Sequence, residues 1–461
     1  MVKKDKSRVK ILVLLFVGVL MGALDISIVG PVIPSVEASM YVEERMITWM
    51  FAIYVLFNLV GIPLFAKLSD LHGRKVIYIV SVFIFAVGSL IVALSTNYDV
   101  LLIGRSVQGF GSSGIFPVAS AVVGDIYPPE KRGRILGILG AVFGIAFVIG
   151  PAIAGIMLTF FTWHALFLIN IPITLYLIIF AFRDLPNNKI KSVTRIDWRG
   201  IMMLGILLAA FAFGINQIDA SAFWNSFLSI DVYPYLLIFI IFLTLFVFSE
   251  RNVKNPVIKV GIFKRQQVII AALIAVGTGF TEASFVFIPK FTVLTFGVNT
   301  AHASFMLLPL VLAAAAGSPI FGRLIDRIGS KRVIKLGLLL PAIGFLLLST
   351  KLISLFIFYF SGLFIGLGLS ILSGSSLRYI MLNEVSADDR ASSQGIVTIF
   401  QSTGRLLGGA IIGVLLAIEK DQSGFDYLFV LLSVMLIVLF IMGFGLKSRV
   451  QEIKTATRTM S

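Results

Sequence analysis

Two acidic residues, Asp25 and Glu282, each interrupt a long apolar stretch, and they lie 257 positions apart in the chain. A carboxylate away from water is costly to keep charged, so such an acid usually faces a cavity, pairs with a cation, or binds and releases a proton. Both are therefore candidates for proton binding, and Glu282 could also attract a cationic ligand. The alternative for each is a buried ion pair with only a structural role.

Two arginines in other apolar stretches are the expected partners of these acids. Arg105 lies at a depth similar to that of Asp25 when helical residues are counted at about 1.5 Å each, so we expect these two to pair. Arg405 is the expected partner of Glu282. Burial raises the proton affinity of an acid and a nearby arginine lowers it, so movement of the arginine would couple conformation to protonation. The proton-coupling candidates are Asp25, Arg105 and Glu282.

Other polar side chains in the apolar stretches have weaker interpretations. Gln108 and Asn58 add hydrogen-bonding capacity, although each could simply bond a neighbouring helix. Arg378 and Lys290 lie close to the ends of their stretches, and their charged tips are expected to reach the membrane interface. The candidate substrate-binding residues are Glu282, Arg405, Gln108 and Asn58.

The composition predicts a protein embedded in a membrane. Of the 461 residues, 58% are hydrophobic and only 13% are charged, too few to cover a water-facing surface. Apolar runs of about 20 residues, the length that crosses a bilayer as a helix, recur along the chain. We expect an all-α integral membrane protein with fourteen spans, or thirteen if the short eighth run is not one. The runs are 11–31, 46–67, 76–95, 100–124, 134–157, 164–183, 198–216, 233–249, 267–290, 302–322, 332–350, 354–378, 393–416 and 426–446.

The 38 Lys and Arg residues are distributed unevenly between the two sides of these spans. All but seven lie on the side of the N-terminus. Four of the seven lie inside spans, and three lie in loops on the other side: Arg45, Lys351 and Lys420. Because basic loops remain in the cytoplasm, we expect both termini there, in a multi-pass protein of the cell membrane. The net charge of +15 is explained by this orientation, so nucleic acid is not an expected partner.

The residue types that most enzymes use are scarce. The chain has no cysteine, and none of its three histidines is spaced as a metal ligand, so the sequence predicts neither thiol chemistry nor a metal site. The segment GFGSSG (109–114) has the spacing of a dinucleotide-binding loop, but it lies in an apolar run with no strand before it. We expect no enzymatic activity and no cofactor, with a proton gradient as the energy source.

The two halves of the chain repeat one another. Besides the two acids, Leu68, Asp70, Gly73 and Lys75 match Leu324, Asp326, Gly329 and Lys331 at an offset of 256, and Arg132 matches Arg390 at 258. Parallel repeats of this kind place a transport site where the halves meet. The predicted units are a six-helix bundle (1–183), a linker with two additional spans (184–266), a second six-helix bundle (267–446) and a cytoplasmic tail (447–461).

Four motifs of the first half resemble those of the major facilitator superfamily, and more closely those of its drug:proton antiporters with fourteen spans. They are LDISIVGPVIP (24–34), KLSDLHGRK (67–75), LLIGRSVQGFGSSG (101–114) and FGIAFVIGPAIAGI (143–156). The second half agrees in segments 307–333 and 400–413. The resemblance implies the major facilitator fold, with two six-helix bundles plus two inserted helices.

The resemblance also implies roles for two groups of residues. The loop motif and its copy would form a conformational latch, although anchoring to the cytoplasmic side explains Arg74 and Lys75 equally well. The latch candidates are Asp70, Gly73, Arg74, Lys75, Asp125 and Asp326. The fifth-span motif is associated with antiport, with helix packing as the alternative, and its residues here are Gly144, Gly150, Pro151 and Gly155.

These observations predict a secondary active transporter that exports lipophilic, often cationic drugs in exchange for protons by alternating access. Its expected partners are a small-molecule substrate, protons and the lipid bilayer, and we expect a monomer. Two alternatives keep the fold. One exports a specific metabolite, a lipid or a tetracycline-type compound, and the other takes up a nutrient by symport.

Overall fold

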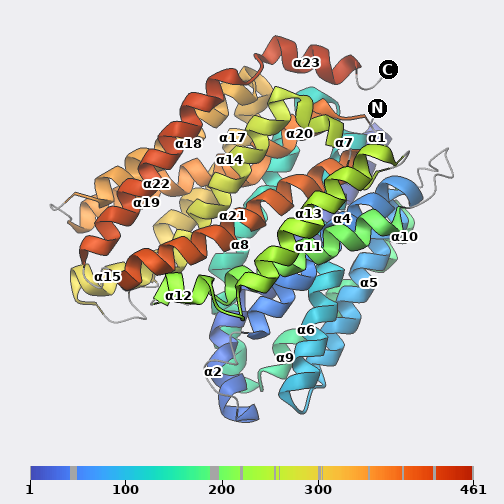
Figure 1. Ribbon diagram of the computed structural model, residues 1–461. Coiled ribbons are helices and arrows are strands. Elements are labelled where there is room, and N and C mark those ends of the chain that lie inside the picture. Colours follow the sequence, from blue (N-terminus) through green and yellow to red (C-terminus); the bar gives the residue numbers. More distant parts are fainter. Residues whose placement is uncertain are drawn as a thin grey trace.

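The computed structural model describes residues 2–41, 49–186, 197–218, 222–253, 256–258, 260–298, 303, 305–350, 354–386, 389–418 and 422–458. Every regular element in these ranges is a helix. The three basic residues expected in loops on the far side, Arg45, Lys351 and Lys420, lie outside the described residues. Figure 1 shows the elements as a bundle of long helices, with both termini at the same end of the molecule. We call this the terminal end.

The first half of the chain forms helices as far as residue 184. They are α1 (Val2–Ser27), α2 (Val29–Met40), α4 (Trp49–His72), α5 (Arg74–Ala93), α6 (Tyr98–Ser112), α7 (Ile115–Ile126), α8 (Pro129–Phe160), α9 (His164–Leu168) and α10 (Asn170–Asp184). The segment that separates the two halves in the sequence contains α11 (Trp198–Asn216), α12 (Phe223–Phe227), α13 (Tyr233–Asn252) and the short η2 (Val260–Lys264). Helix α11 packs on α13 and, outside this segment, mainly on α4 of the first half and also on α21 (Arg390–Ile418) of the second half.

The second half begins at residue 266. It contains α14 (Gln266–Ala283), η3 (Ser284–Val286), α15 (Ile288–Phe296), α17 (Leu308–Ile328), α18 (Ser330–Leu348), α19 (Leu355–Leu369), η4 (Ser370–Ser376), α20 (Leu377–Glu384), α21 (Arg390–Ile418), α22 (Gln422–Met442) and η6 (Gly443–Gly445). The last helix, α23 (Arg449–Arg458), lies across the terminal end (Figure 1).

Twelve helices among the described residues are long and apolar enough to cross a membrane. The expected fifth and eleventh spans fall in α8 and α18, which have 32 and 19 residues but are not among the twelve. Helix α18 begins with three basic residues, Lys331, Arg332 and Lys335, which lower its apolar character. The chain is a multi-pass membrane protein, and fourteen spans remain a prediction.

Five of the expected spans, the first, fourth, sixth, ninth and twelfth, contain a break in the helix. The first is two helices, because α1 ends at Ser27 and α2 continues to Met40. The fourth breaks between α6 and α7 in the sequence SSG, where Ser112 and Ser113 bond to backbone carbonyls of their own helix turn. The twelfth contains η4, a π-helical segment with the sequence SILSGSS. Glycine and serine pairs are common causes of such breaks.

The two halves meet where α8 packs on α17 and η4, and the packing is close because glycines line this contact. A Cβ atom added at Gly137 would lie 2.4 Å from the backbone oxygen of Ser318, and one at Gly140 would lie 2.7 Å from the Cα of Gly374. Side chains at these positions would force the helices apart, as expected for small residues in membrane helices. The matching contact joins α4 to α21, where Gly395 packs against Ile62.

Candidate functional site

Asp25 lies near the end of α1 and is completely buried. Its carboxylate accepts three hydrogen bonds from two other helices of the first half. Arg105 Nη1 on α6 donates to Oδ2 at 2.7 Å, while Gln108 Nε2 and Asn170 Nδ2 donate to Oδ1 at 2.6 and 3.2 Å. The expected pairing of Asp25 with Arg105 is therefore present. Three donors compensate the charge of the acid inside a dry bundle.

Arg105 is itself completely buried and held from several sides. Its Nε donates to the backbone oxygen of Met50 at 3.2 Å, and its Nη1 also donates to Gln108 Oε1 at 2.6 Å. The guanidinium lies 4.3 Å from the ring centre of Tyr54. These contacts fix the arginine beside the acid, so any change in their separation requires movement of α1 relative to α6.

The candidate substrate-binding residues Gln108 and Asn58 do not share one surface with Glu282. Gln108 is completely buried in the Asp25 network, where it also bonds Ser89 Oγ at 2.8 Å. Asn58 Nδ2 donates to Ser112 Oγ at 2.7 Å, which joins α4 to α6. Both amides therefore connect helices in this conformation, as the alternative interpretation of each residue expected.

Glu282, the repeat equivalent of Asp25, has a different environment. Its Oε2 accepts a bond of 2.5 Å from Arg405 Nε on α21, and its Oε1 accepts one from Ser373 in η4. The side chain of Arg405 is 52% exposed and that of Glu282 is 17% exposed. The expected pair is therefore present, but unlike the pair in the first half it is accessible. A ligand could reach it without unfolding the bundle.

Arg378 does not lie where the sequence predicted. We expected its charged tip to reach the membrane interface, but the residue is only 2% exposed. Its guanidinium lies 3.9 Å from the ring centre of Phe116, which belongs to α7 of the other half. The position near the end of an apolar run was misleading, because the start of α20 is covered by the opposing half. Lys290 is exposed as expected.

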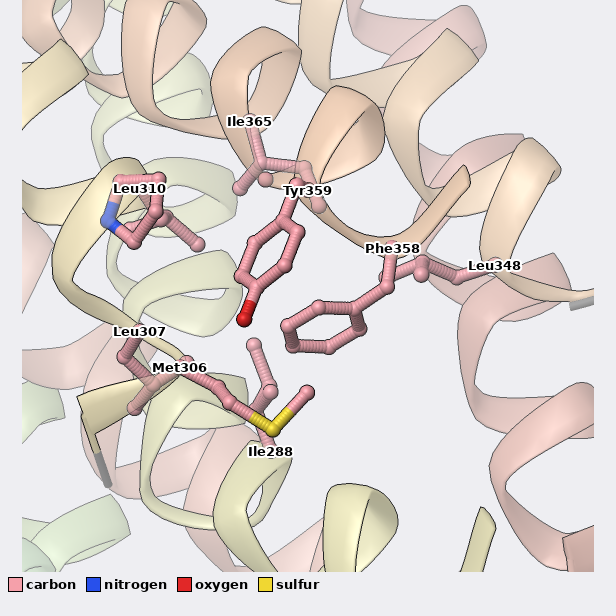
Figure 2. Close-up of a pocket in the computed structure, with 10 residues that line it drawn as sticks. Ile288, Met306, Leu307, Leu310, Leu348, Phe358, Tyr359 and Ile365 are labelled. Carbon is pink, nitrogen blue, oxygen red and sulfur yellow. The ribbon is translucent and has the colours of Figure 1, made fainter. Parts of the chain in front are cut away.

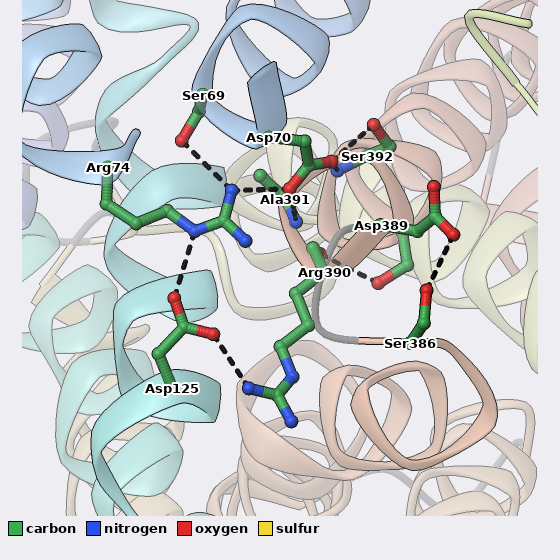
Figure 3. Close-up of polar contacts among 10 residues, drawn as sticks. Ser69, Asp70, Arg74, Asp125, Ser386, Asp389, Arg390, Ala391 and Ser392 are labelled. Atoms are coloured by element: carbon green, nitrogen blue, oxygen red, sulfur yellow. Dashed lines mark hydrogen bonds and ion pairs between the residues drawn. The ribbon is translucent and has the colours of Figure 1, made fainter. Parts of the chain in front are cut away.

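The latch candidate Asp70 joins the two halves at the end of α4. Its carboxylate accepts bonds from the backbone nitrogens of Ala391 and Ser392 at 3.0 and 2.8 Å, and from Ser392 Oγ at 2.6 Å (Figure 3). These are free N–H groups in the first turn of α21, where a carboxylate also interacts favourably with the helix dipole. Asp70 therefore caps a helix of the opposite half.

Arg74 and Asp125 extend this junction. Arg74 pairs with Asp70 on its own half, and its Nε donates to Asp125 Oδ2 at 3.0 Å. Arg390 of the other half reaches Asp125 Oδ1 at 2.7 Å (Figure 3). The acid at the end of α7 thus binds one arginine from each half. Sequence reasoning placed Asp125 in the latch but did not identify Arg390 as its partner.

Asp326 makes the equivalent junction in the second half. Its two carboxylate oxygens accept bonds from the backbone nitrogens of Gly133 and Arg134 at 2.9 and 2.8 Å. These residues belong to the first turns of α8, in the first half. Each half therefore presents an acid to the N-terminal turns of a helix in the other half, and the recurrence of an acid in the repeat has a physical reason.

The remaining latch residues have local roles. Gly73 has a φ of +95° and Gly329 has a φ of +88°, a conformation that glycine adopts most easily, so each allows the chain to reverse between two spans. Lys75 does not reach the junction between the halves. Its ammonium group instead donates to the backbone oxygen of Phe182 on α10.

The glycines of the fifth-span motif have different surroundings. A Cβ atom at Gly144 would lie 2.7 Å from that of Ala315 on α17, so this glycine belongs to the interface between the halves. Gly150 packs against Ser27 at the end of α1, whereas Gly155 faces open space. Pro151 lies within α8, but its side chain is outside the described residues.

Two hollows lined by apolar residues lie away from these polar groups. The first, between α15, α17 and α19, has a volume of about 10 Å³, room for about one water molecule (Figure 2). The second is a groove of about 480 Å³ between α4 and α11, lined by residues such as Phe57, Val60 and Met202. The groove is large enough for part of a lipophilic molecule or an acyl chain.

Several site residues escaped sequence reasoning. Asn170 and Ser89 complete the Asp25 network, Ser373 holds Glu282, and Ser392 holds Asp70. Asn170 offered a signal, because an amide deep in an apolar run needs a partner. The serines offered none, since a serine in a membrane helix can bond its own backbone.

Comparisons with known proteins agree with this architecture. The family model described as Major Facilitator Superfamily matches residues 15–316 and 269–459. Multidrug transporter protein MdtP of Bacillus subtilis (strain 168) is 30% identical over 434 residues, covering 91% of this chain and 77% of that protein. Multidrug resistance protein 3 of the same organism is 29% identical over 406 residues, covering 87% and 78%.

Another relative from the same bacterium, the uncharacterized MFS-type transporter YfiU, is 28% identical over 426 residues and covers 91% of this chain and 82% of its own. Among solved structures, the human organic anion transporter MFSD10 (TETRAN) superposes with a TM-score of 0.70 at 16% identity, covering 95% of this chain and 99% of that one. That likeness concerns the fold alone. The paired halves, the reciprocal junctions and the matching family model together establish that the chain belongs to the major facilitator superfamily, a family of membrane transporters.

Proposed function

We propose that this transporter is a proton-coupled antiporter that exports lipophilic, often cationic compounds by alternating access. The observation that carries the proposal is the contrast between its two repeated acids. Asp25 is completely buried among three donors, whereas Glu282 is accessible beside a half-exposed arginine. A ligand therefore cannot reach Asp25 in this conformation, whereas it can reach Glu282.

Asp25 is assigned to proton coupling. A buried carboxylate remains charged only while its donors stay in place, and separation from Arg105 would favour the neutral, protonated form. Because the donors come from α6 and α10, tilting of α1 relative to these helices changes proton affinity. Proton binding would thereby favour one conformation over the other.

Glu282 is assigned to cargo recognition, with Arg405 as its resting partner. A cationic cargo that approaches the carboxylate can replace the guanidinium, and a proton can replace the cargo. Competition of this kind makes binding of cargo and binding of a proton at Glu282 mutually exclusive. Relatives named for multidrug transport and resistance support a cargo of this class.

The latch gives the orientation of this state. The junctions of Asp70 and Asp326 join the halves at the ends of α4 and α17, where the basic loops lie. Basic loops mark the cytoplasmic side. The terminal end is therefore assigned to the cytoplasm, and the present conformation is closed toward it.

The decisive experiment uses inverted membrane vesicles with an imposed pH gradient, acidic inside. Addition of lipophilic cationic dyes should dissipate the gradient in vesicles containing the transporter but not in vesicles without it. The experiment should include a panel of neutral and anionic metabolites. No response to the dyes, combined with a response to a single metabolite, would instead support a transporter with a specific cargo.

A further inference from the structure

Arg378 is a buried cation that forms no ion pair with an acid in the part of the chain that the structure describes. Its Nη2 donates to Thr398 Oγ1 at 3.2 Å, while its Nε and Nη1 have no hydrogen-bond partner among the residues that the structure describes. Phe116 covers one face of the guanidinium. A buried charge is normally paired, so two free donors on one guanidinium indicate that a ligand is missing.

The nearby charges do not neutralise it. Arg378 lies within electrostatic range of Glu282 and Arg405, whose charges act on it in opposite directions. Glu282 already pairs with Arg405, so these three charges leave an excess of one positive charge around Arg378.

The internal repeat allows the surroundings of Arg378 to be compared with the equivalent contact between the halves. At the offset of 258, Gly140 and Gly374 correspond to Thr398 and Phe116, while Arg378 corresponds to Ser120. In one interface the two glycines meet directly, at a distance that excludes a side chain. In the other, a threonine and a phenylalanine leave a space that the guanidinium enters. One interface is dry and close-packed, and its counterpart is polar.

The segment before Arg378 is also unusual. It is the π-helix η4, whose residues Ser375 and Ser376 are buried with hydroxyls that have no partner among the described residues. π-helical turns are rare and are frequently found at functional sites. Unpaired hydroxyls next to an unpaired guanidinium provide further donors for an anion.

We propose that Arg378 forms an anion-binding site at the interface between the halves, which takes a carboxylate or a halide. Phe116 belongs to the opposite half, so separation of the halves at the cytoplasmic end uncovers the guanidinium. The accessibility of the site rests on the alternating access in the proposed function, whereas its affinity for anions does not. The ligand is either the acidic group of a zwitterionic cargo or a small anion from solution.

Thermal unfolding of the purified full-length chain, followed by the fluorescence of its four tryptophans, tests the site. The probes are sodium chloride, sodium acetate, a rhodamine with a free carboxylate, and the methyl ester of the same dye. Arg378→Gln is compared with the wild type and with Arg183→Gln, which removes an exposed arginine at the end of α10. General effects of salt are common to all three proteins.

We expect a saturable rise in Tm for the wild type and Arg183→Gln that is lost in Arg378→Gln. Without anion, Arg378→Gln should be at least as stable as the wild type, because an unpaired buried charge has been removed. A response to chloride or acetate identifies a small anion as the ligand, whereas a response to the carboxylate dye alone identifies the acid of a cargo. Equal responses of wild type and Arg378→Gln to every probe would refute the site.

Two further measurements separate this inference from the proposed function. If Arg378→Gln fails to fold, Arg378→Lys replaces it in the test. The lysine keeps the charge but has fewer donors, so we expect it to bind the anion about tenfold more weakly than the wild type. Export of the methyl ester, a lipophilic cation, should persist in Arg378→Gln. If the wild type binds anions but does not export the ester, the site is supported and the proposed function fails.

Discussion

Asp25 and Glu282 occupy equivalent positions in the two repeats but experience different physical conditions. The first is sealed among the donors of three residues, and the second shares its charge with a half-exposed arginine. Electrostatic interactions in a site without water are strong, and breaking them costs much free energy. Those of exposed ion pairs are weak, so another ligand can replace one partner. Residue type therefore identified two candidate acids, and the difference between their environments is the basis for proposing different roles.

Replacement of Asp25 by Asn should lower both the stability of the protein and its proton exchange, and a second substitution should restore only the stability. The neutral amide leaves Arg105 charged and unpaired, which costs about 3–5 kcal/mol of stability for a buried pair. The double variant Asp25→Asn, Arg105→Gln should recover much of this stability. In both variants, the rate at which protons are exchanged for cargo in vesicles should fall by about tenfold or more.

Asp99→Asn, at an exposed position in the first turn of α6, is the matched control and should retain full exchange. Normal proton exchange in a folded Asp25→Asn protein would contradict the assignment of this residue to coupling.

Replacement of Glu282 by Gln should cost little stability but should strongly reduce the export of cations. The pair with Arg405 is accessible, so its loss should cost about 1 kcal/mol or less in unfolding experiments. Export of a lipophilic cation should fall by about tenfold, since the carboxylate that attracts it is gone. Export of a neutral analogue should be much less affected, and an equal loss for both would disprove a role in recognition of charge.

Helix α23 binds the terminal end through a single buried acid. Glu452 is 5% exposed and accepts bonds from the backbone nitrogen and hydroxyl of Ser330, at the start of α18. Lys447, just before the helix, pairs with Glu384 at the end of α20. Because α23 also contacts α8 of the first half, it can bind fully only while the halves are together at this end.

Binding of α23 should weaken as the pH rises. Burial raises the pKa of Glu452, against the opposing effect of its bonds to Ser330. A raised pKa means that the bound helix holds a proton more tightly than the free helix, so binding is strongest at low pH and is lost as the pH passes the raised value. The protection factors of amides 449–458, which correct for the intrinsic rise of exchange with pH, should fall accordingly, while Glu452→Gln should remove this dependence on pH. An unchanged pH profile in Glu452→Gln would exclude this acid as the cause.

At the scale of the whole molecule, the halves are joined by two acids that each bond the backbone of a helix in the opposite half. Asp70 of the first half caps α21, and Asp326 of the second half bonds the N-terminal turns of α8. In the proposed alternating access, both junctions open when the transporter opens toward the cytoplasm. Membership of a transporter family also confirms that the chain is not an enzyme.

The two junctions should differ in strength. Asp70 accepts three bonds from α21 and pairs with Arg74, whereas Asp326 accepts two backbone bonds from α8. At about 1.5–3 kcal/mol for each bond to a charged group, Asp70→Asn should shift the population toward the inward-open form more than Asp326→Asn.

Because the chain has no cysteine, a single reporter suffices. Ala121 is completely buried with Ala66 and Ala391 between the halves, so Ala121→Cys should react with maleimide only when they separate. We expect the labelling rate to rise more for Asp70→Asn than for Asp326→Asn, and the reverse order would contradict the contact geometry.

Much of the fold follows from local pattern. Apolar runs, basic loops and the ordered repeat depend on residues close in sequence, and they predicted the helical class, the two related halves and the identity of the two acids. They could not predict the breaks at Ser113 and in η4, because such breaks depend on which neighbouring helix accepts the distorted turn.

The sequence by itself determined which charged residues enter the membrane and that Asp25 and Glu282 are equivalent. Only the tertiary structure decided what surrounds them. Burial of Arg378, capping of α21 by Asp70 and the partnership of Asp125 with Arg390 all join residues more than 200 positions apart. Such contacts depend on how two bundles pack, and packing is set by the shapes of opposing surfaces rather than by the periodicity of either helix.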